Sequence, residues 1–346
     1  NVNIMLCSIE CNRSKPLAAD PGSASFVQDL RDWTQLTHNI FIWDYVVQFR
    51  NLLDPFPNLR VLQPNIQFFA ANGITSIFEQ GMNSLHCEMG ELRTYLIAKL
   101  LWNPYVDIDS VMNDFLQGYY GKAAPFIRSY IDIMHDALDS SGANLDIYGY
   151  PFTPENGYLS TRMLDQYGAI FEKAESVVAG EPEYLARVQT ARLPLQYVLL
   201  EQAKVYGPQP RGFFQKGEGD HWEVRPEMEA LLDTFVVRCN RAHIEILWEG
   251  GTSPDEYLAS TRKYLAESMQ PHLALYKPVD LASPASQKYH NGDRSALTDG
   301  LKGNEDYHIN WLGFEGEDME ATIDLGSVHQ ITSVKTEFLQ DINSWV

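Results

Sequence analysis

The stretch "GITSIFEQG", Gly73 to Gly81, is a largely apolar run followed by an acid, Glu79, and an amide, Gln80. Its β-branched and aromatic residues, bounded by two glycines, predict a short buried β-strand. A carboxylate at the edge of such a strand costs free energy unless another group pairs with it or uses it. Glu79 therefore serves either the fold or a functional site.

Two similar runs precede this strand, "VNIMLCSIE" at Val2 to Glu10 and "NIFIWDYV" at Asn39 to Val46, with helical patterns between them. The three predicted strands end at Glu10, Asp44 and Glu79, at intervals of 34 and 35 residues. Such a period is typical of the strand-plus-helix unit of a parallel α/β fold. Three units cannot close an eight-stranded barrel, so residues 1–102 form either an open sheet or, as we expect, the carboxyl-terminal half of a (β/α)8-type barrel.

The rest of the chain divides into two further predicted domains. Residues 103–275 hold long amphipathic stretches punctuated by glycine and proline, which predict an α-helical domain with a long loop at 207–223. Residues 276–346 hold short alternating runs between glycines, which predict a partial β-sandwich. The predicted fold class is therefore α/β, with a partial barrel, a helical domain and a partial β-sandwich.

Composition excludes several classes of partner. The net charge is -20 and no cluster of Lys and Arg stands out, so nucleic acid and anionic membrane surfaces are poor candidates. No apolar run reaches the roughly 18 residues of a membrane-spanning helix. Both ends of the sequence read as the interior of folded elements, so we expect a piece of a longer protein. The four cysteines lack metal-ligand spacing and are expected to be buried free thiols.

The three predicted strand ends carry acids. In a parallel barrel the carboxyl ends of the strands converge on one mouth, where barrel enzymes have their active sites. Glu10, Asp44 and Glu79 are thus candidate catalytic residues for glycoside hydrolysis, in which one carboxyl protonates the leaving oxygen and another attacks or activates water. The structural alternative is that these acids anchor loops by accepting hydrogen bonds from backbone amides.

Candidate substrate-binding residues lie next to the acids. Trp43 and Tyr45 flank Asp44, and aromatic rings stack on the apolar faces of sugars. Gln80 offers an amide to sugar hydroxyls. Asn12 and Arg13, just past the first strand, either bind substrate oxygens or tie down the loop that contains them.

The first part of the chain contains four long motifs, "IMLCSIECNRSKPL", "IFIWDYVVQFRNLLDPFPNLRVLQPNIQFFAANGITSIFEQG", "EMGELRTYLIAKLLWNP" and "FLQGYYGKAAPFIRSYI". These motifs closely resemble a family of secreted bacterial proteins known as a domain of unknown function. That family is thought similar to α-glucuronidases and β-hexosaminidases, whose barrels precede a helical domain. The resemblance implies a secreted, periplasmic or cell-surface protein. Similarity to the inverting α-glucuronidases implies that Asp44 and Glu79 are the water-activating base and its partner, with the general acid on an earlier strand.

The end of the chain, "ALTDGLKGNEDYHINWLGFEGEDMEATIDLGSVHQITSVKTEFLQ", resembles the opening half of a coagulation-factor type C, or discoidin-like, domain. Such β-sandwiches often bind carbohydrate. Their "LTDG" turn often lies near a calcium ion, which makes Asp299 a candidate ligand of a structural calcium. No cofactor is expected for catalysis.

Three functional hypotheses follow. The first is a glycoside hydrolase-like protein that acts on a polysaccharide or glycan. The second is a non-catalytic carbohydrate-binding protein that keeps the pocket for recognition. The third is a helical interaction scaffold, which predicts an exposed apolar groove on the helices and no converging acids.

Overall fold

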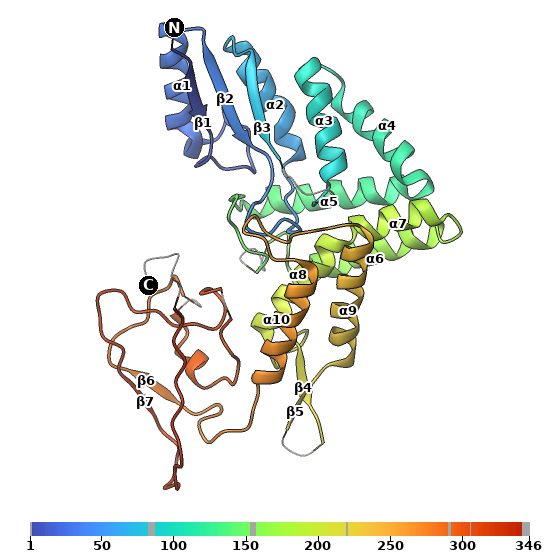
Figure 1. The fold of residues 1–346 in the computed structure, drawn as a ribbon. Coiled ribbons are helices and arrows are strands. Elements are labelled where there is room, and N and C mark those ends of the chain that lie inside the picture. Colours follow the sequence, from blue (N-terminus) through green and yellow to red (C-terminus); the bar gives the residue numbers. More distant parts are fainter. Residues whose placement is uncertain are drawn as a thin grey trace. The chain divides into compact units, whose positions relative to one another are not determined.

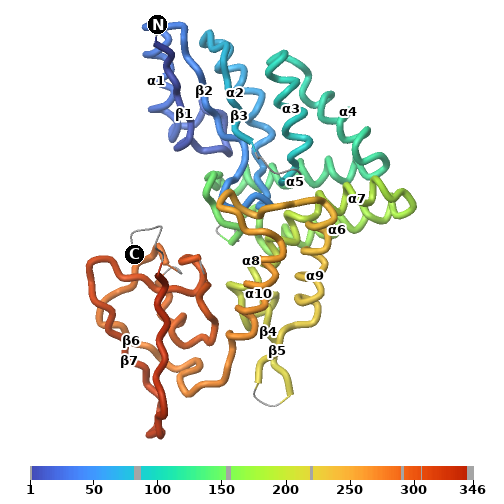
Figure 2. Tube along the Cα trace, in the orientation of Figure 1, coloured from blue at the N-terminus to red at the C-terminus, as the bar shows by residue number. Residues whose placement is uncertain are grey.

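The computed structural model describes residues 2–81, 87–152, 157–218, 221–289, 292–304 and 306–340. The chain forms two compact units (Figure 1, Figure 2). The first joins Asn1–Leu199 with Thr234–Pro254, and the second joins Leu200–Asp233 with Asp255–Val346. No helix in the described ranges has both the length and the apolar character needed to cross a membrane.

The first unit begins with three parallel strands, β1 (Ile4–Cys7), β2 (Ile40–Tyr45) and β3 (Ser76–Gln80), side by side in that order. Helices α1 (Ala24–Leu36) and α2 (Leu59–Ala71) connect them. The predicted parallel strand-and-helix order is therefore present. The half barrel stays a prediction, because the described strands of this unit form a three-stranded sheet.

One face of this sheet is covered by the two helices. Ile40 and Ile42 of β2 belong to the same buried core as Leu30 of α1 and Phe69 of α2. Because side chains alternate along a strand, the residues between them point to the other face. That face, called here the open face, leaves the β3 residue Phe78 44% exposed.

Five more helices continue the first unit. They are α3 (Gly90–Trp102), α4 (Ile108–Tyr120), α5 (Ala124–Ser141), α6 (Thr161–Val177) and α7 (Pro182–Ala191). One buried core runs from Tyr45 through Leu100 of α3 and Tyr130 of α5 to Phe171 of α6. This compact unit therefore extends across the domain boundary that the sequence analysis put at residues 102 and 103, because the later helices bury the apolar residues of the sheet region.

The α-helices and β-strands that follow are α8 (Leu193–Tyr206), β4 (Phe214–Lys216), β5 (Trp222–Val224), α9 (Pro226–Arg241), α10 (Pro254–Glu267), β6 (Val279–Leu281) and β7 (Ala321–Ile323). The segment 207–223, expected to be only a loop, contains β4 and the start of β5, which pair antiparallel. In the described part of residues 276–346, the antiparallel pair β6–β7 is the regular sheet structure. The partial discoidin-like sandwich stays a prediction.

The cysteines differ in burial. All four are free thiols, as expected. Cys11 and Cys239 are buried, but Cys7 is exposed and Cys87 is partly exposed. Cys7 lies on the open face of the sheet, because it is the register partner of Trp43. The prediction that every cysteine is buried is therefore wrong.

Candidate functional site

The carboxyl ends of β2 and β3 place two acids side by side. Asp44 and Glu79 are register partners in the parallel ladder, so their side chains share one face of the sheet. They are on the same face as Ile42 and Ile77, which pack toward α1 and α2. The sequence prediction that these two acids are neighbours is therefore correct.

The third predicted acid lies elsewhere. Strand β1 ends at Cys7, not at Glu10, because the chain turns there and the Cys11 amide donates to the Ser8 carbonyl at 2.9 Å. Glu10 is exposed on that turn. The residue level with Asp44 is Ser8, whose amide donates to the Trp43 carbonyl at 3.1 Å. The prediction that the first strand ends in an acid is wrong.

Asp44 is held by two buried groups. The Ser8 hydroxyl donates to Asp44 Oδ1, and Arg13 Nη1 lies 3.3 Å from the same oxygen. Arg13 also donates through Nη2 to the Ser8 carbonyl. The side chains of Arg13 and Asp44 are only 3% and 4% exposed. Arg13, a candidate substrate ligand in the sequence, is therefore the buried counter-ion of Asp44.

Glu79 lies in a different environment. Both of its carboxyl oxygens are buried, and neither accepts a hydrogen bond from a donor in the described part of the chain. Burial and the neighbouring Asp44 raise the pKa of Glu79 well above its usual range, against the opposing charge of Arg13. The pair therefore combines a buried carboxyl of raised pKa with one that faces a cation.

The predicted aromatic and amide residues meet on the open face. Trp43 Nε1 donates to Gln80 Oε1 at 2.6 Å. The Trp43 ring stacks on Tyr45 with centroids 6.1 Å apart and meets the edge of Phe78 at 5.4 Å. In a β/α barrel the face away from the helices lines the interior. The structure thus places these groups on the open face and the two acids on the helix-covered face.

Asn12 anchors a loop. Its Nδ2 donates to Asn144 Oδ1 at 3.0 Å, and its Oδ1 accepts from the amides of Ser14 at 2.9 Å and Leu145 at 3.1 Å. These bonds join the loop after β1 to residues 144–145. Of the two roles that the sequence left open, this geometry corresponds to loop anchoring.

Asp299 belongs to the second compact unit. Its Oδ1 accepts from the Leu301 amide at 2.8 Å, and burial raises its pKa to about 7. Across the part of the chain that the structure describes, no group of three or more His, Cys, Asp or Glu side chains is arranged to hold a metal ion. The role of Asp299 as a calcium ligand stays a prediction.

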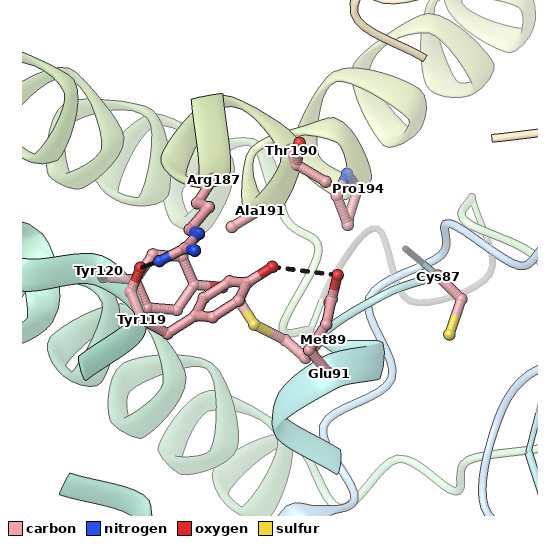
Figure 3. A pocket seen from close by; sticks show the side chains of 9 residues that line it. All are labelled: Cys87, Met89, Glu91, Tyr119, Tyr120, Arg187, Thr190, Ala191 and Pro194. Carbon is pink, nitrogen blue, oxygen red and sulfur yellow. Dashed lines mark hydrogen bonds between the residues drawn. The ribbon is translucent and has the colours of Figure 1, made fainter. Parts of the chain in front are cut away.

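A small cavity lies away from the acids, between α3, α4 and α7 (Figure 3). Tyr119 donates from its hydroxyl to Glu91 Oε1 at 3.2 Å, and Arg187 Nη1 donates to the Tyr119 carbonyl at 3.0 Å. The cavity volume is about 10 Å³, close to that needed for one water molecule. It is too small for a sugar and takes no part in the candidate site.

Comparison with known proteins covers only part of the chain. No curated protein and no solved structure matches it. A family model described as a domain of unknown function, DUF4838, matches residues 1–132. The match includes β1 to β3, α1 to α4 and the first half of α5. The chain therefore contains a DUF4838 domain over residues 1–132.

Proposed function

We propose that the carboxyl ends of β1 to β3 form part of a glycoside hydrolase-like site that acts on a polysaccharide or glycan. The observation that carries this proposal is the pair Asp44 and Glu79, which share one sheet face and have contrasting environments. Glycoside hydrolysis needs such a pair, because one carboxyl has to be neutral and the other charged at the same pH.

The environments suggest a role for each acid. Neutral Glu79 acts as general acid and gives its proton to the glycosidic oxygen as the bond from that oxygen to the anomeric carbon breaks. Asp44, whose charge Arg13 compensates, stabilises the developing positive charge or takes the proton of the attacking water. This assignment differs from the one implied by the resemblance to α-glucuronidases, in which both residues act on the water.

A separate sugar-binding surface is assigned to the open face, on the opposite side of the sheet from the two acids. Trp43 and Phe78 offer ring faces to the apolar side of a sugar, and Gln80 offers an amide. We place this sheet in a larger (β/α)8-type barrel, because parallel sheets are normally covered on both faces, whereas Met5 and Phe78 are 54% and 44% exposed here. By the resemblance, the protein is secreted, periplasmic or on the cell surface.

A second candidate function is carbohydrate binding without hydrolysis. It is favoured by the burial of both acids, because Asp44 is 3% exposed and the carboxyl oxygens of Glu79 are shielded from solvent. In that case the acids stabilise the strand ends, and the open face alone contacts the sugar. The two functions predict different results for the same set of variants.

The test is a panel of soluble polysaccharides, with both retention in affinity electrophoresis and release of reducing ends measured. The chain is compared with Asp44→Asn, Glu79→Gln and the exposed control Glu10→Gln. For a hydrolase, the first two variants lose roughly 10²-fold or more of the release rate, and the control keeps it.

Two outcomes would decide against hydrolysis by this pair. Unchanged turnover in Glu79→Gln and Asp44→Asn would remove both acids from the chemistry. Retention of a polysaccharide by all four proteins, with no reducing ends released by any, would establish the binding function instead. Far-UV circular dichroism of each variant separates loss of activity from loss of fold.

A further inference from the structure

The turn between α3 and α4 carries an exposed aromatic pair. Trp102 is 92% exposed and Tyr105 is 70% exposed, with Leu101 beside them at 46%. Isolated exposed apolar side chains are ordinary on protein surfaces. Here three lie within five residues of one turn, and two of them are large aromatic rings that could each have been buried with a gain in stability.

This turn is fixed by side chains of α2. Gln63 Nε2 donates to the carbonyls of Pro104 at 3.1 Å and Val106 at 2.8 Å, and Gln67 Nε2 donates to the Pro104 carbonyl at 2.9 Å. The backbone next to the aromatic pair is therefore held in place. A ligand that binds a rigid surface loses little free energy to ordering it.

The turn lies at the opposite end of the sheet from the two acids. Helices run antiparallel to the strands in a parallel β/α arrangement, so α3 ends level with the amino ends of β1 to β3 (Figure 1). Asp44 and Glu79 lie at the carboxyl ends. The aromatic pair is thus separate from the candidate site described above.

We infer that Trp102 and Tyr105 form a second binding site, which takes a neutral glycan chain. The flat faces of the two rings suit the apolar faces of sugar rings, and the hydroxyl group of Tyr105 suits sugar hydroxyls. This role does not depend on the chemistry of the acid pair, so the site is present whether the protein hydrolyses the glycan or only binds it.

Size argues against a protein partner. A stable protein–protein interface uses about 20 to 30 residues on each side. The exposed group contains three apolar side chains, which is little for such an interface but enough for one or two sugar rings.

Charge argues against a membrane or an acidic glycan. Asp107 and Asp109 follow the turn directly and are both exposed, and the chain as a whole carries a net charge of -20. Arg128, which lies 2.8 Å from Asp109, also pairs with Asp132 at 2.9 Å. The nearest cation on α3, Lys99, lies over the ring of Tyr95 at 5.1 Å. Anionic lipid headgroups attract basic rather than acidic segments. Among glycans, a neutral chain therefore suits this turn better than an anionic one.

The experiment is affinity electrophoresis of the chain in gels that contain laminarin, xyloglucan, galactomannan or, as the anionic comparison, polygalacturonate. Trp102→Ala and Tyr105→Ala are compared with Trp33→Ala, a matched tryptophan that is 37% exposed on α1. We expect at least one neutral polysaccharide to retard the chain, Trp102→Ala to weaken its affinity roughly tenfold or more, and Trp33→Ala to leave it unchanged. The double variant Gln63→Leu, Gln67→Leu should also bind more weakly while keeping both rings.

Several results would overturn this inference. Equal retardation of the chain and Trp102→Ala in every neutral gel would remove the site. Vesicles of phosphatidylcholine and phosphatidylserine that bind the chain but not Trp102→Ala would show a membrane contact, and a Trp102-dependent dimer in sedimentation velocity would show a protein interface. Glu79→Gln should keep Trp102-dependent binding. A failure of the proposed hydrolysis would therefore leave this binding intact, and the two proposals can be judged independently.

Discussion

At the residue scale, Arg13 is the group that stabilises the buried Asp44 of the acid pair. Its guanidinium contacts Asp44 and the Ser8 carbonyl, and all three groups are buried. A buried ion pair stabilises a protein only weakly compared with apolar packing, but removing one partner leaves a buried charge without compensation. The loss of Arg13 should therefore cost much more than the loss of an exposed arginine.

We predict that Arg13→Gln lowers the free energy of unfolding by about 3 to 5 kcal/mol at neutral pH. The control is Arg60→Gln, because Arg60 also pairs with acids, at 2.8 Å to Asp136 and 2.9 Å to Asp139, but its side chain is 43% exposed. The control should lose less than about 1 kcal/mol. Urea unfolding followed by circular dichroism measures both variants. Equal losses would show that breaking the buried Arg13–Asp44 pair costs no more than breaking an exposed one.

Glu79 makes stability depend on pH. Its pKa is raised in the folded state by burial and by Asp44, so as pH rises above the unfolded value of about 4.3 the unfolded chain loses this proton first. Stability then falls with pH until the folded pKa is passed. We predict that Glu79→Gln removes this fall, so that the variant gains stability relative to the original chain between pH 4 and pH 8.

Urea unfolding of both proteins at a series of pH values measures the Glu79 effect. The matched control is Glu10→Gln, which removes an exposed carboxyl from the turn after β1. A difference between Glu79→Gln and the original chain that stays constant from pH 4 to pH 8 would mean that Glu79 titrates as an ordinary glutamate.

The sequence predicted some of these contacts and missed others. The adjacency of Asp44 and Glu79 follows from the strand period. The hydrogen bond from Trp43 to Gln80 does not, because the period pairs Trp43 with Phe78. The role of Ser8 was missed, because it depends on the register of β1 against β2. The only signal was a lone hydroxyl within the apolar run "IMLCSI", 36 residues before Asp44.

At the element scale, α1 shows how one face of a helix holds the sheet. Leu30 is fully buried in the core shared with β2 and α2, whereas Leu36 at the end of the same helix is 76% exposed. In the sequence, Phe26, Leu30, Trp33 and Leu36 recur at helical spacing, which predicts that both leucines lie on one apolar face. This spacing did not show that the last turn of the helix extends beyond the sheet that it covers.

We predict that Leu30→Ala lowers the free energy of unfolding by about 2 to 5 kcal/mol, because it opens a cavity between α1 and the sheet. Leu36→Ala should change it by less than about 0.5 kcal/mol. Thermal or urea unfolding measures both variants. Similar losses would mean that the end of α1 is packed as tightly as its middle.

Strand boundaries and short hairpins were the least predictable elements. The run Val2 to Glu10 yields only the four-residue strand Ile4–Cys7, because the chain turns after Ser8. The β4–β5 pair formed in a segment whose glycine, proline and charge content indicated a loop. Each of its strands has three residues, too few for alternation to be recognised in a sequence.

At the scale of the whole molecule, the sheet and the helices after it share one core. Tyr45 and Leu100 from the first 102 residues are buried together with Leu116 and Tyr167 from the later helices. Composition and helical periodicity change near residue 103, which indicated a boundary. They could not show that these helices pack on the sheet region, because such contacts join residues far apart in the sequence.

We predict that residues 1–102 alone do not fold cooperatively, because their apolar side chains would lose the helices that cover them. A longer polypeptide, residues 1–254, should unfold in a cooperative thermal transition. Near-UV circular dichroism with heating compares the two. A sharp transition in the shorter polypeptide would show that residues 1–102 are an autonomous domain.

The contrast between Asp44 and Glu79 is the centre of the proposed function, and carbon NMR of the carboxyl groups tests it most directly. With labelled glutamate, the resonance that disappears in Glu79→Gln identifies Glu79 in a pH titration of the chain. We predict that this resonance titrates well above the usual glutamate range of about 4.3, and that it shifts on addition of a polysaccharide that the chain retains. Titration of Glu79 together with the exposed glutamates would contradict the neutral carboxyl on which the proposed chemistry depends.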